Sequence, residues 1–328
     1  MKVARVAVFA GLFAVLGAVA GAAFAQGATP GTYPTRSIRL WQGFAAGGNG
    51  DIIARLVAAK ISEGLGQSVV VEGRTGAGGN LASELVAKSL PDGYTLILLT
   101  GGHAVSAAMY KKLPFEPVAD FSFVSLVNVF PFVIGTSAEG AVKSVREMVD
   151  AARRDPGRLS FSSVGIGSTQ HLAGELLASM AKVQLVHVPY RGGGAPVQDV
   201  MTGRVDFLFD TLTPTLPQIR AGKLRAIAVT SRTRVASLPD VPAVGETVPG
   251  YEVMSWTGVA APAKTPPEIV RRLSQEVVKA VAAPDVQKRL SELGAEPRSS
   301  TPDEMRVHVE SEIAKWRRVV DEAKIERQ

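Results

Sequence analysis

The sequence has 328 residues, and its 36 lysines and arginines against 30 aspartates and glutamates give a formal net charge of +6. Because it contains no cysteine, disulfides and a lipid-modified amino-terminal cysteine are excluded. Basic and acidic residues are intermixed along the chain, whereas nucleic-acid binding requires a sustained basic stripe with a recognisable motif. A chain of this length buries enough apolar surface for one large domain or two ordinary ones.

The first 25 residues have the pattern of an export signal. Met1–Arg5 is short and basic, Val6–Ala20 is apolar, and Ala23–Ala25 matches the small-residue cleavage pattern. We therefore expect residues 1–25 to be a cleaved signal peptide and the mature chain to begin at Gln26 in the periplasm. The alternative is a membrane anchor, but the apolar run is shorter than the roughly 20 residues that a span needs.

Along the mature chain, short β-rich runs alternate with helical patterns, which indicates an α/β fold with mostly parallel strands. Two apolar crossings, Phe121–Thr136 and Val248–Gly258, predict two lobes. We place lobe 1 in residues 26–130 and 253–328 and lobe 2 in residues 131–252. A cleft between two such lobes is a common ligand site. The expected strands are Ile38–Phe44, Ser68–Glu72, Thr95–Thr100, Ser122–Thr136, Ser160–Val164, Val186–Val188, Val205–Phe209, Arg225–Thr230 and Glu252–Ala260.

Three helix starts carry capping-box patterns. In this motif a Ser or Thr side chain caps the first free N–H groups, and the side chain of a Glu three residues later accepts a hydrogen bond from the backbone N–H of the cap residue. The three patterns are Ser144–Glu147, Thr265–Glu268 and Thr301–Glu304. The last of these helices has one apolar stripe at helical spacing, which predicts core packing. The stripe consists of Met305, Val309, Ile313, Trp316 and Val320.

The glycine-rich segment Phe44–Asp51 lies between an expected strand and an expected helix. Such a loop directs bare backbone N–H groups, at the positive end of a helix dipole, toward whatever lies above it, so it predicts an anion seat. Similar small polar loops follow four other strands, beginning at Thr100, Gly165, Tyr190 and Asp210. In an open α/β sheet, ligands gather beyond the carboxyl ends of the strands, where all five loops are expected.

No complete catalytic or cofactor motif is present in these loops. Gly165–Gln170 lacks the third glycine of a dinucleotide fingerprint, and no Gly-Lys-Ser/Thr phosphate loop occurs. Ser168 and His171 have the spacing of a cap and a first-turn side chain, and no Gly-x-Ser-x-Gly elbow accompanies them. His171 and Glu175 are one turn apart, but no third metal ligand is visible. We expect no catalysis, cofactor or metal; the alternative class is a secreted hydrolase that uses Ser168 or His103.

For each of three polar residues in or beside the loops, the sequence is compatible with two roles. His103 faces a ligand or orders its loop by bonding a carbonyl group. Asp51 caps the first helix or contacts the ligand directly. Asp210, at a strand end over the cleft, orders its loop or binds an amino or hydroxyl group.

Eight sequence blocks occur in one order and resemble those of a known family. They are Tyr33-Pro-Thr-Arg-Ser-Ile-Arg, Gly47-Gly48-x-x-Asp51-x-x-Ala54-Arg55, Gly76-Ala-Gly-Gly-Asn80, Pro91-Asp-Gly-Tyr-Thr95, Gly167-Ser168-x-x-His171-Leu-Ala-Gly-Glu175, His187-Val-Pro-Tyr-Arg191-Gly, Leu224-Arg-Ala-Ile-Ala-Val-Thr230 and Leu238-Pro-Asp-Val-Pro242. With these blocks, the chain from Tyr33 to about Val319 resembles the Bug (TctC-like) extracytoplasmic solute-binding receptors of tripartite tricarboxylate transporters.

The resemblance implies a two-lobed periplasmic binding protein fold, type II-like, that closes on a small carboxylate such as a di- or tricarboxylate or an amino acid. It implies delivery to membrane transporter subunits, with a sensor protein as the alternative partner, and we expect a monomer that binds no nucleic acid. In such receptors backbone N–H groups, small hydroxyls and ordered waters hold one carboxylate. Carried over, one wall consists of Phe44, Ala46, Gly47, Gly48 and Asp51, and the other of Ser168, Thr169, His171 and Asp210, with Arg191 as a looser candidate. His103 is a further candidate because of its position in the loop after Thr100.

Overall fold

Ten strands within residues 33–328, the part of the chain that the computed structural model describes, form one sheet. The order is β2-β1-β3-β9-β4-β7-β5-β6, and β8 and β10 also pair with β4. The predicted signal peptide lies outside the described residues. The strands are β1 Ile38–Gln42, β2 Val69–Gly73, β3 Thr95–Thr100, β4 Phe121–Ser137, β5 Ser160–Ser163, β6 Val186–Pro189, β7 Phe207–Thr211, β8 Leu224–Val229, β9 Met254–Pro262 and β10 Glu296–Pro297.

The long strand β4 joins two regions of this sheet. From Phe121 to Pro131 it pairs with β9, and from Phe132 to Ser137 it pairs with β7 and β8. We call the strands around the first part of β4 sheet A (β1, β2, β3, β9, β10) and those around its second part sheet B (β5, β6, β7, β8). The chain therefore crosses from one sheet to the other near the predicted position, while the lobe limits themselves stay a prediction.

The predicted α/β class is confirmed, and the sheet is mixed. In sheet A β1 runs parallel to β2 and β3, and in sheet B β5 runs parallel to β6 and β7. β4 and β9 run antiparallel to each other, and each is also antiparallel to the strand on its other side. This follows from the topology, because a chain that leaves sheet A along β4 and returns along β9 must reverse its direction.

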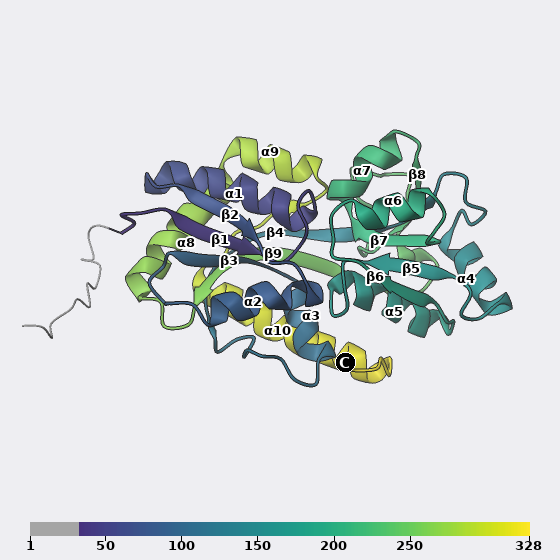
Figure 1. The fold of residues 1–328 in the computed structure, drawn as a ribbon. Coiled ribbons are helices and arrows are strands. Elements are labelled where there is room, and N and C mark those ends of the chain that lie inside the picture. The colour runs from purple at the N-terminus through teal and green to yellow at the C-terminus, as the bar shows by residue number, and fades with distance from the viewer. Residues whose placement is uncertain (1–32) are drawn as a thin grey trace, which may run out of the picture. The chain divides into compact units, whose positions relative to one another are not determined.

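Helices cover both sides of the sheet (Figure 1). α1 and α2 lie on opposite sides of sheet A, as expected for right-handed crossovers from β1 to β2 and from β2 to β3 when β1 is the middle strand. The helices are α1 Asn49–Leu65, α2 Asn80–Ala87, α3 Gly102–Met109, α4 Val145–Arg154, α5 Thr169–Ala181, α6 Ala195–Met201, α7 Leu212–Arg220, α8 Pro267–Ala282, α9 Pro284–Glu292 and α10 Pro302–Glu322, with 3₁₀ turns at Ala77–Gly79 and Val244–Glu246.

Two of the three predicted helix caps form. Ser144 accepts a hydrogen bond from the Glu147 backbone N–H at the start of α4. Thr301 and Glu304 form the complete capping box of α10, and every member of the predicted α10 stripe is buried. The prediction for Thr265 is wrong, because its hydroxyl donates to the Pro262 carbonyl in the turn after β9 and α8 starts without a side-chain cap.

We expect Thr301→Ala to lower the free energy of unfolding by about 1 kcal/mol, because the backbone N–H of Glu304 loses its acceptor. Urea denaturation measures this change. The matched control is Thr233→Ala, because Thr233 is exposed and its hydroxyl has no hydrogen-bond partner among the described residues. Equal midpoints for the two variants would contradict the prediction.

Candidate functional site

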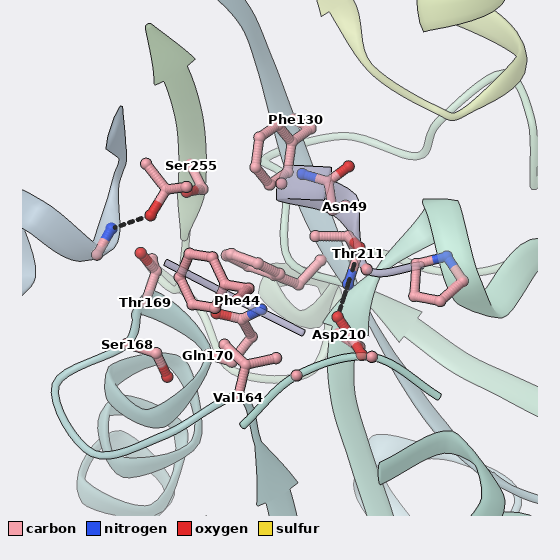
Figure 2. Close-up of a pocket in the computed structure, with 18 residues that line it drawn as sticks. Phe44, Asn49, Phe130, Val164, Ser168, Thr169, Gln170, Asp210, Thr211 and Ser255 are labelled. Carbon is pink, nitrogen blue, oxygen red and sulfur yellow. Dashed lines mark hydrogen bonds between the residues drawn. The ribbon is translucent and has the colours of Figure 1, made fainter. Parts of the chain in front are cut away.

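A cavity of about 490 Å³, including space open to solvent, lies among the strand-end loops of sheets A and B. All five loops that the sequence singles out contribute to this central cavity (Figure 2). Their common position beyond the carboxyl ends of the strands is therefore observed. The lining residues are Phe44, Gly48, Asn49, Gly50, Thr100, Gly102, Phe130, Phe132, Val164, Ser168, Thr169, Gln170, Gly192, Gly193, Asp210, Thr211, Pro214 and Ser255.

Four helices begin at the central cavity. The residues preceding the helices are Gly48 for α1, Gly101 for α3, Ser168 for α5 and Thr211 for α7. At α1, α3 and α7 no side chain caps the first turn. The first N–H groups of a helix have no intrahelical acceptor and lie at the positive end of its dipole. The cavity can therefore stabilise an anion through backbone groups.

Five of the eleven predicted site residues line the central cavity: Phe44, Gly48, Ser168, Thr169 and Asp210. Ser168 caps α5, because its Oγ accepts from the His171 N–H at 3.2 Å and donates to the Gly165 carbonyl at 2.6 Å. Its hydroxyl proton is thus directed at a backbone carbonyl and not at an imidazole nitrogen. This geometry gives no support to a Ser168 nucleophile.

Asp51 does not line the central cavity and instead holds the glycine loop. It is the third residue of α1, which begins at Asn49, so it is not the N-cap. Its carboxylate accepts from the Gly47 N–H at 3.1 Å and from Arg55 Nε at 3.0 Å. Burial raises the pKa of Asp51, but the hydrogen bonds from Arg55 and Gly47 outweigh it and leave the pKa below its usual value. The charged carboxylate thus fixes the loop.

His103 lies in the core beside the central cavity and does not line it. Its Nε2 is 2.7 Å from the Pro117 carbonyl oxygen, and its ring contacts Phe115 and Phe121 at 5.6 and 5.0 Å between centroids. Burial lowers the pKa of His103 to about 4. The structure therefore matches the interpretation in which this histidine orders its loop by bonding a carbonyl.

His171 supports the cavity from behind. Its Nδ1 accepts from the Gly167 N–H at 3.3 Å, and its ring stacks on His187 at 3.9 Å. Burial lowers the pKa of His171 to about 4, so the ring is neutral at pH 7. Glu175 Oε1 is 3.7 Å from its Nε2, but within residues 33–328 no group of three His, Cys, Asp or Glu side chains could hold a metal ion.

The remaining predicted residues, Ala46, Gly47 and Arg191, are not among the residues that line the central cavity. The exposed Arg191 lines a neighbouring groove together with Arg74. Its carbonyl accepts from the Ala45 N–H at 3.1 Å, which joins the first glycine loop to the loop after β6. Ligand contact by these residues stays a prediction.

Asp210 is the ionisable side chain that lines the central cavity. It is 4% exposed, and its Oδ1 accepts from the Thr211 N–H at 2.7 Å. Burial raises the pKa of Asp210 to about 6, against the opposing effect of hydrogen bonds from Thr211 and Gln170. No lysine, arginine or histidine of the described chain is among the lining residues. Among the described residues that line the cavity, the groups that favour an anion are therefore the helix starts.

Several lining residues were not predicted from the sequence. Phe130 and Phe132 come from β4 and Ser255 comes from β9, all where the chain crosses between the sheets. Phe130 and Phe132 are two apart on a strand, so their side chains point to the same side. The Phe-Pro-Phe sequence inside a predicted crossing is the signal that could have identified them.

Direct hydrogen bonds join the loops of sheet A to those of sheet B across the central cavity. Thr213 Oγ1 donates to Asn49 Oδ1 at 2.6 Å, and Ser106 Oγ donates to the Gly167 carbonyl at 3.2 Å. Backbones also meet closely: a Cβ added to Gly78, whose φ is +63°, would lie 2.7 Å from the Ile166 carbonyl oxygen. The two sets of loops are thus in direct contact beside the cavity.

Comparison with known proteins gives a family-model match over most of the chain. The model of the tripartite tricarboxylate transporter family receptor matches residues 53–325. Protein BugT of Bordetella pertussis is 33% identical over 315 residues, which cover 95% of this chain and 97% of BugT. In residues 33–328 no helix has both the length and the apolar character required to cross a bilayer.

Two solved structures with bound carboxylates are similar to this chain. Rpa4515 of R. palustris, solved with adipate, is 38% identical with a TM-score of 0.87, and the match covers 90% of this chain and 100% of that one. MatC (Rpa3494) of Rhodopseudomonas palustris, solved with bound malate, is 34% identical with a TM-score of 0.84, covering 88% of this chain and 100% of that one. The resemblance inferred from the sequence blocks is confirmed.

The buried side chains around the site predict how stability depends on pH. His103, His171 and His187 have folded-state pKa values of about 4, about 4 and about 3, below the ordinary value of 6.5. Between pH 6.5 and 4 the unfolded chain therefore binds more protons at these histidines, and the free energy of unfolding falls as the pH falls. Asp210, raised from 3.8 to about 6, acts in the opposite direction.

We expect urea denaturation between pH 7 and pH 4 to show a net loss of stability on acidification, since three histidines with lowered pKa values outweigh Asp210 and Glu175, whose pKa values burial raises. His103→Gln should make this loss smaller, and Asp210→Asn should make it larger. The readout is the slope of the unfolding free energy against pH, so a uniform destabilisation by either substitution does not affect the comparison. Slopes that both variants share with the unmodified protein would refute the assignment.

Proposed function

The chain belongs to the tripartite tricarboxylate transporter receptor family and is a solute-binding receptor, and we propose that it captures a small organic acid by lobe closure and delivers it to a tripartite transporter. The adipate and malate bound to the two similar structures support an organic acid as the ligand. In this proposal residues 26–130 and 253–328 move as one lobe and residues 131–252 as the other, bending where β4 and β9 pass between the sheets.

The observation that carries this proposal is the convergence of the α1, α3, α5 and α7 starts on the central cavity. A carboxylate placed there is stabilised by backbone N–H groups and helix dipoles. Phe44, Gly48, Ser168, Thr169 and Asp210 are the proposed contacts. Ordered waters complete the shell, and water-mediated hydrogen bonds are nearly as favourable as direct ones.

In the proposed mechanism, closure of the lobes tells a membrane partner that the ligand is bound. A ligand that binds between two sets of loops shifts the protein toward the state in which they meet, to the extent that it binds this state more tightly. The Thr213–Asn49 and Ser106–Gly167 hydrogen bonds belong to that state. A membrane partner can then distinguish loaded protein from empty protein by shape.

The proposed location is the periplasm, with residues 1–25 as the export signal. No enzymatic activity is proposed, because Ser168 is occupied as a helix cap and His103 is bound to a carbonyl in the core. A sensory role would use the same closure with a signalling protein as partner. Affinity capture with the purified receptor distinguishes the two by whether transporter subunits or a sensor are retained.

A thermal-shift screen of organic acids tests the function. An acid present at 100 times its Kd should add about 2.7 kcal/mol to the free energy of unfolding and raise the melting temperature. Mass spectrometry of the small molecules released on denaturation gives an independent readout. If no acid raises the melting temperature and none is released, the proposed function is wrong.

Thr213→Val tests closure. Thr213 and Asn49 come from opposite sets of loops, and losing their hydrogen bond should cost about 1 kcal/mol, or about fivefold in ligand affinity. Isothermal titration calorimetry measures this with the acid found in the screen. Thr202→Val is the control and should leave the affinity unchanged, because Thr202 is the exposed residue that follows α6. Identical affinities for both variants would argue against closure through this contact.

A further inference from the structure

The charge balance of the central cavity limits how many carboxylates it can hold. No basic side chain of the described chain lines it, and the start of each helix is equivalent to only roughly half an elementary charge. Asp210 adds a carboxylate of its own when ionised. A buried charge without a partner is strongly unfavourable. The cavity therefore balances one carboxylate of the ligand and disfavours a second or third.

Aromatic side chains form one part of the cavity wall. Phe44, Phe130 and Phe132 all line it, and the rings of Phe130 and Phe132 are packed edge to face at 5.8 Å between centroids. Phe130 is 5% exposed and Phe132 is 1% exposed, so both rings are fixed by their surroundings. Val164 and Pro214 are further apolar residues of the lining. Such a wall accommodates an apolar body and provides no hydrogen bonds to polar groups.

Two buried hydroxyls mark one end of the cavity. Thr169 and Ser255 are 2% and 3% exposed, and neither side chain has a hydrogen-bond partner among residues 33–328. They converge at the start of α3, because a Cβ on Gly101 would lie 2.5 Å from Ser255 Oγ and 3.2 Å from Thr169 Oγ1. Because both residues line the cavity and their hydroxyls are not engaged by other described residues, they are free to donate to an acceptor of the ligand. Beside a helix start, that acceptor is the carboxylate.

The opposite end presents an acceptor to the ligand. In Figure 2 Asp210 and Thr211 lie across the cavity from Thr169 and Ser255, with Phe44 between them in this view. Asp210 accepts hydrogen bonds from Thr211 and Gln170, and the two oxygens of a carboxylate provide about four acceptor positions. It can thus accept a further hydrogen bond from a ligand hydroxyl, whereas it repels a ligand carboxylate.

We propose that the preferred ligand is a monocarboxylate with a ring-sized apolar body and a hydroxyl at its far end, of the hydroxyaryl carboxylate class. The carboxylate binds Thr169, Ser255 and the α3 and α5 starts, the ring packs against Phe130 and Phe132, and the hydroxyl donates to Asp210. This inference rests on the proposed function and narrows it, since it selects against the tricarboxylates of the family name.

Calorimetric titration at neutral pH with four probes tests the inference. The affinities of 4-hydroxybenzoate and benzoate differ only through the ligand hydroxyl. The affinities of benzoate and adipate differ through the ring and through the second carboxylate of adipate. Citrate carries a third carboxylate. We expect 4-hydroxybenzoate to bind at least about tenfold more tightly than each other acid, because a site that bonds a ligand hydroxyl rejects an analogue lacking it. Citrate should give no binding heat.

Two variants test whether Asp210 and Phe130 cause the preference for 4-hydroxybenzoate. Asp210→Asn should reduce the preference for 4-hydroxybenzoate over benzoate, because the ligand hydroxyl loses a charged acceptor. Phe130→Leu should weaken binding of both aryl acids and leave adipate within about twofold, because the lost contact is with the ring. Phe123→Leu is the matched control, since Phe123 is equally buried on β4 and does not line the cavity. It should leave all affinities unchanged.

The possible outcomes distinguish the ligand preference from the receptor function. Tighter binding of adipate or citrate than of both aryl acids overturns this inference while the receptor function stands. Equal binding of 4-hydroxybenzoate and benzoate, or a preference that Asp210→Asn leaves intact, overturns the role of Asp210. Binding of no carboxylate at all overturns the proposed function and this inference with it.

Discussion

The pairing of β4 with β9 is the interaction on which the rest of the structure depends. These strands contact each other along the centre of the sheet and carry the chain in both directions between sheets A and B. The parallel strands on either side are each tied to this centre through β3 or β7. Because the strands on both flanks are oriented by β4 and β9, their carboxyl ends and the loops that follow face the same central cavity. The binding site is therefore a consequence of strand direction.

The proposed site relies on backbone groups where many anion sites use arginine, since no basic side chain of the described residues lines the cavity. An arginine brings a full charge on a flexible side chain, whereas a helix start brings a partial charge in a position fixed by the fold. Such a seat costs little conformational entropy when the ligand arrives. It also leaves the selection of the ligand to the few side chains that complete the wall, such as Phe132 and Asp210.

The sequence predicted all nine of the longer strands and the five loops around the cavity, because hydrophobic alternation and glycine-rich turns are local signals. β10, with two residues, is too short to give such a signal. β7 begins two residues later than predicted, so Asp210 is part of the strand and lies deeper in the protein. The cap predicted at Thr265 failed because a nearby carbonyl competed for the hydroxyl.

Within the site, the sequence could identify loops but not neighbours across the fold. Phe130, Phe132 and Ser255 reach the cavity only because β4 and β9 cross between the sheets in a particular register. The placement of His103 between Phe115 and Phe121 likewise depends on tertiary packing that no local pattern encodes. The backbones of Gly78 and Ile166 lie so close that a Cβ on Gly78 would be 2.7 Å from the Ile166 carbonyl oxygen, and under the proposed closure this approach limits how far the two sets of loops can move together. If the backbone sets the spacing of the loops in this way, the proposed receptor can acquire a new specificity through the side chains inside the cavity, while the contacts between the loops stay the same.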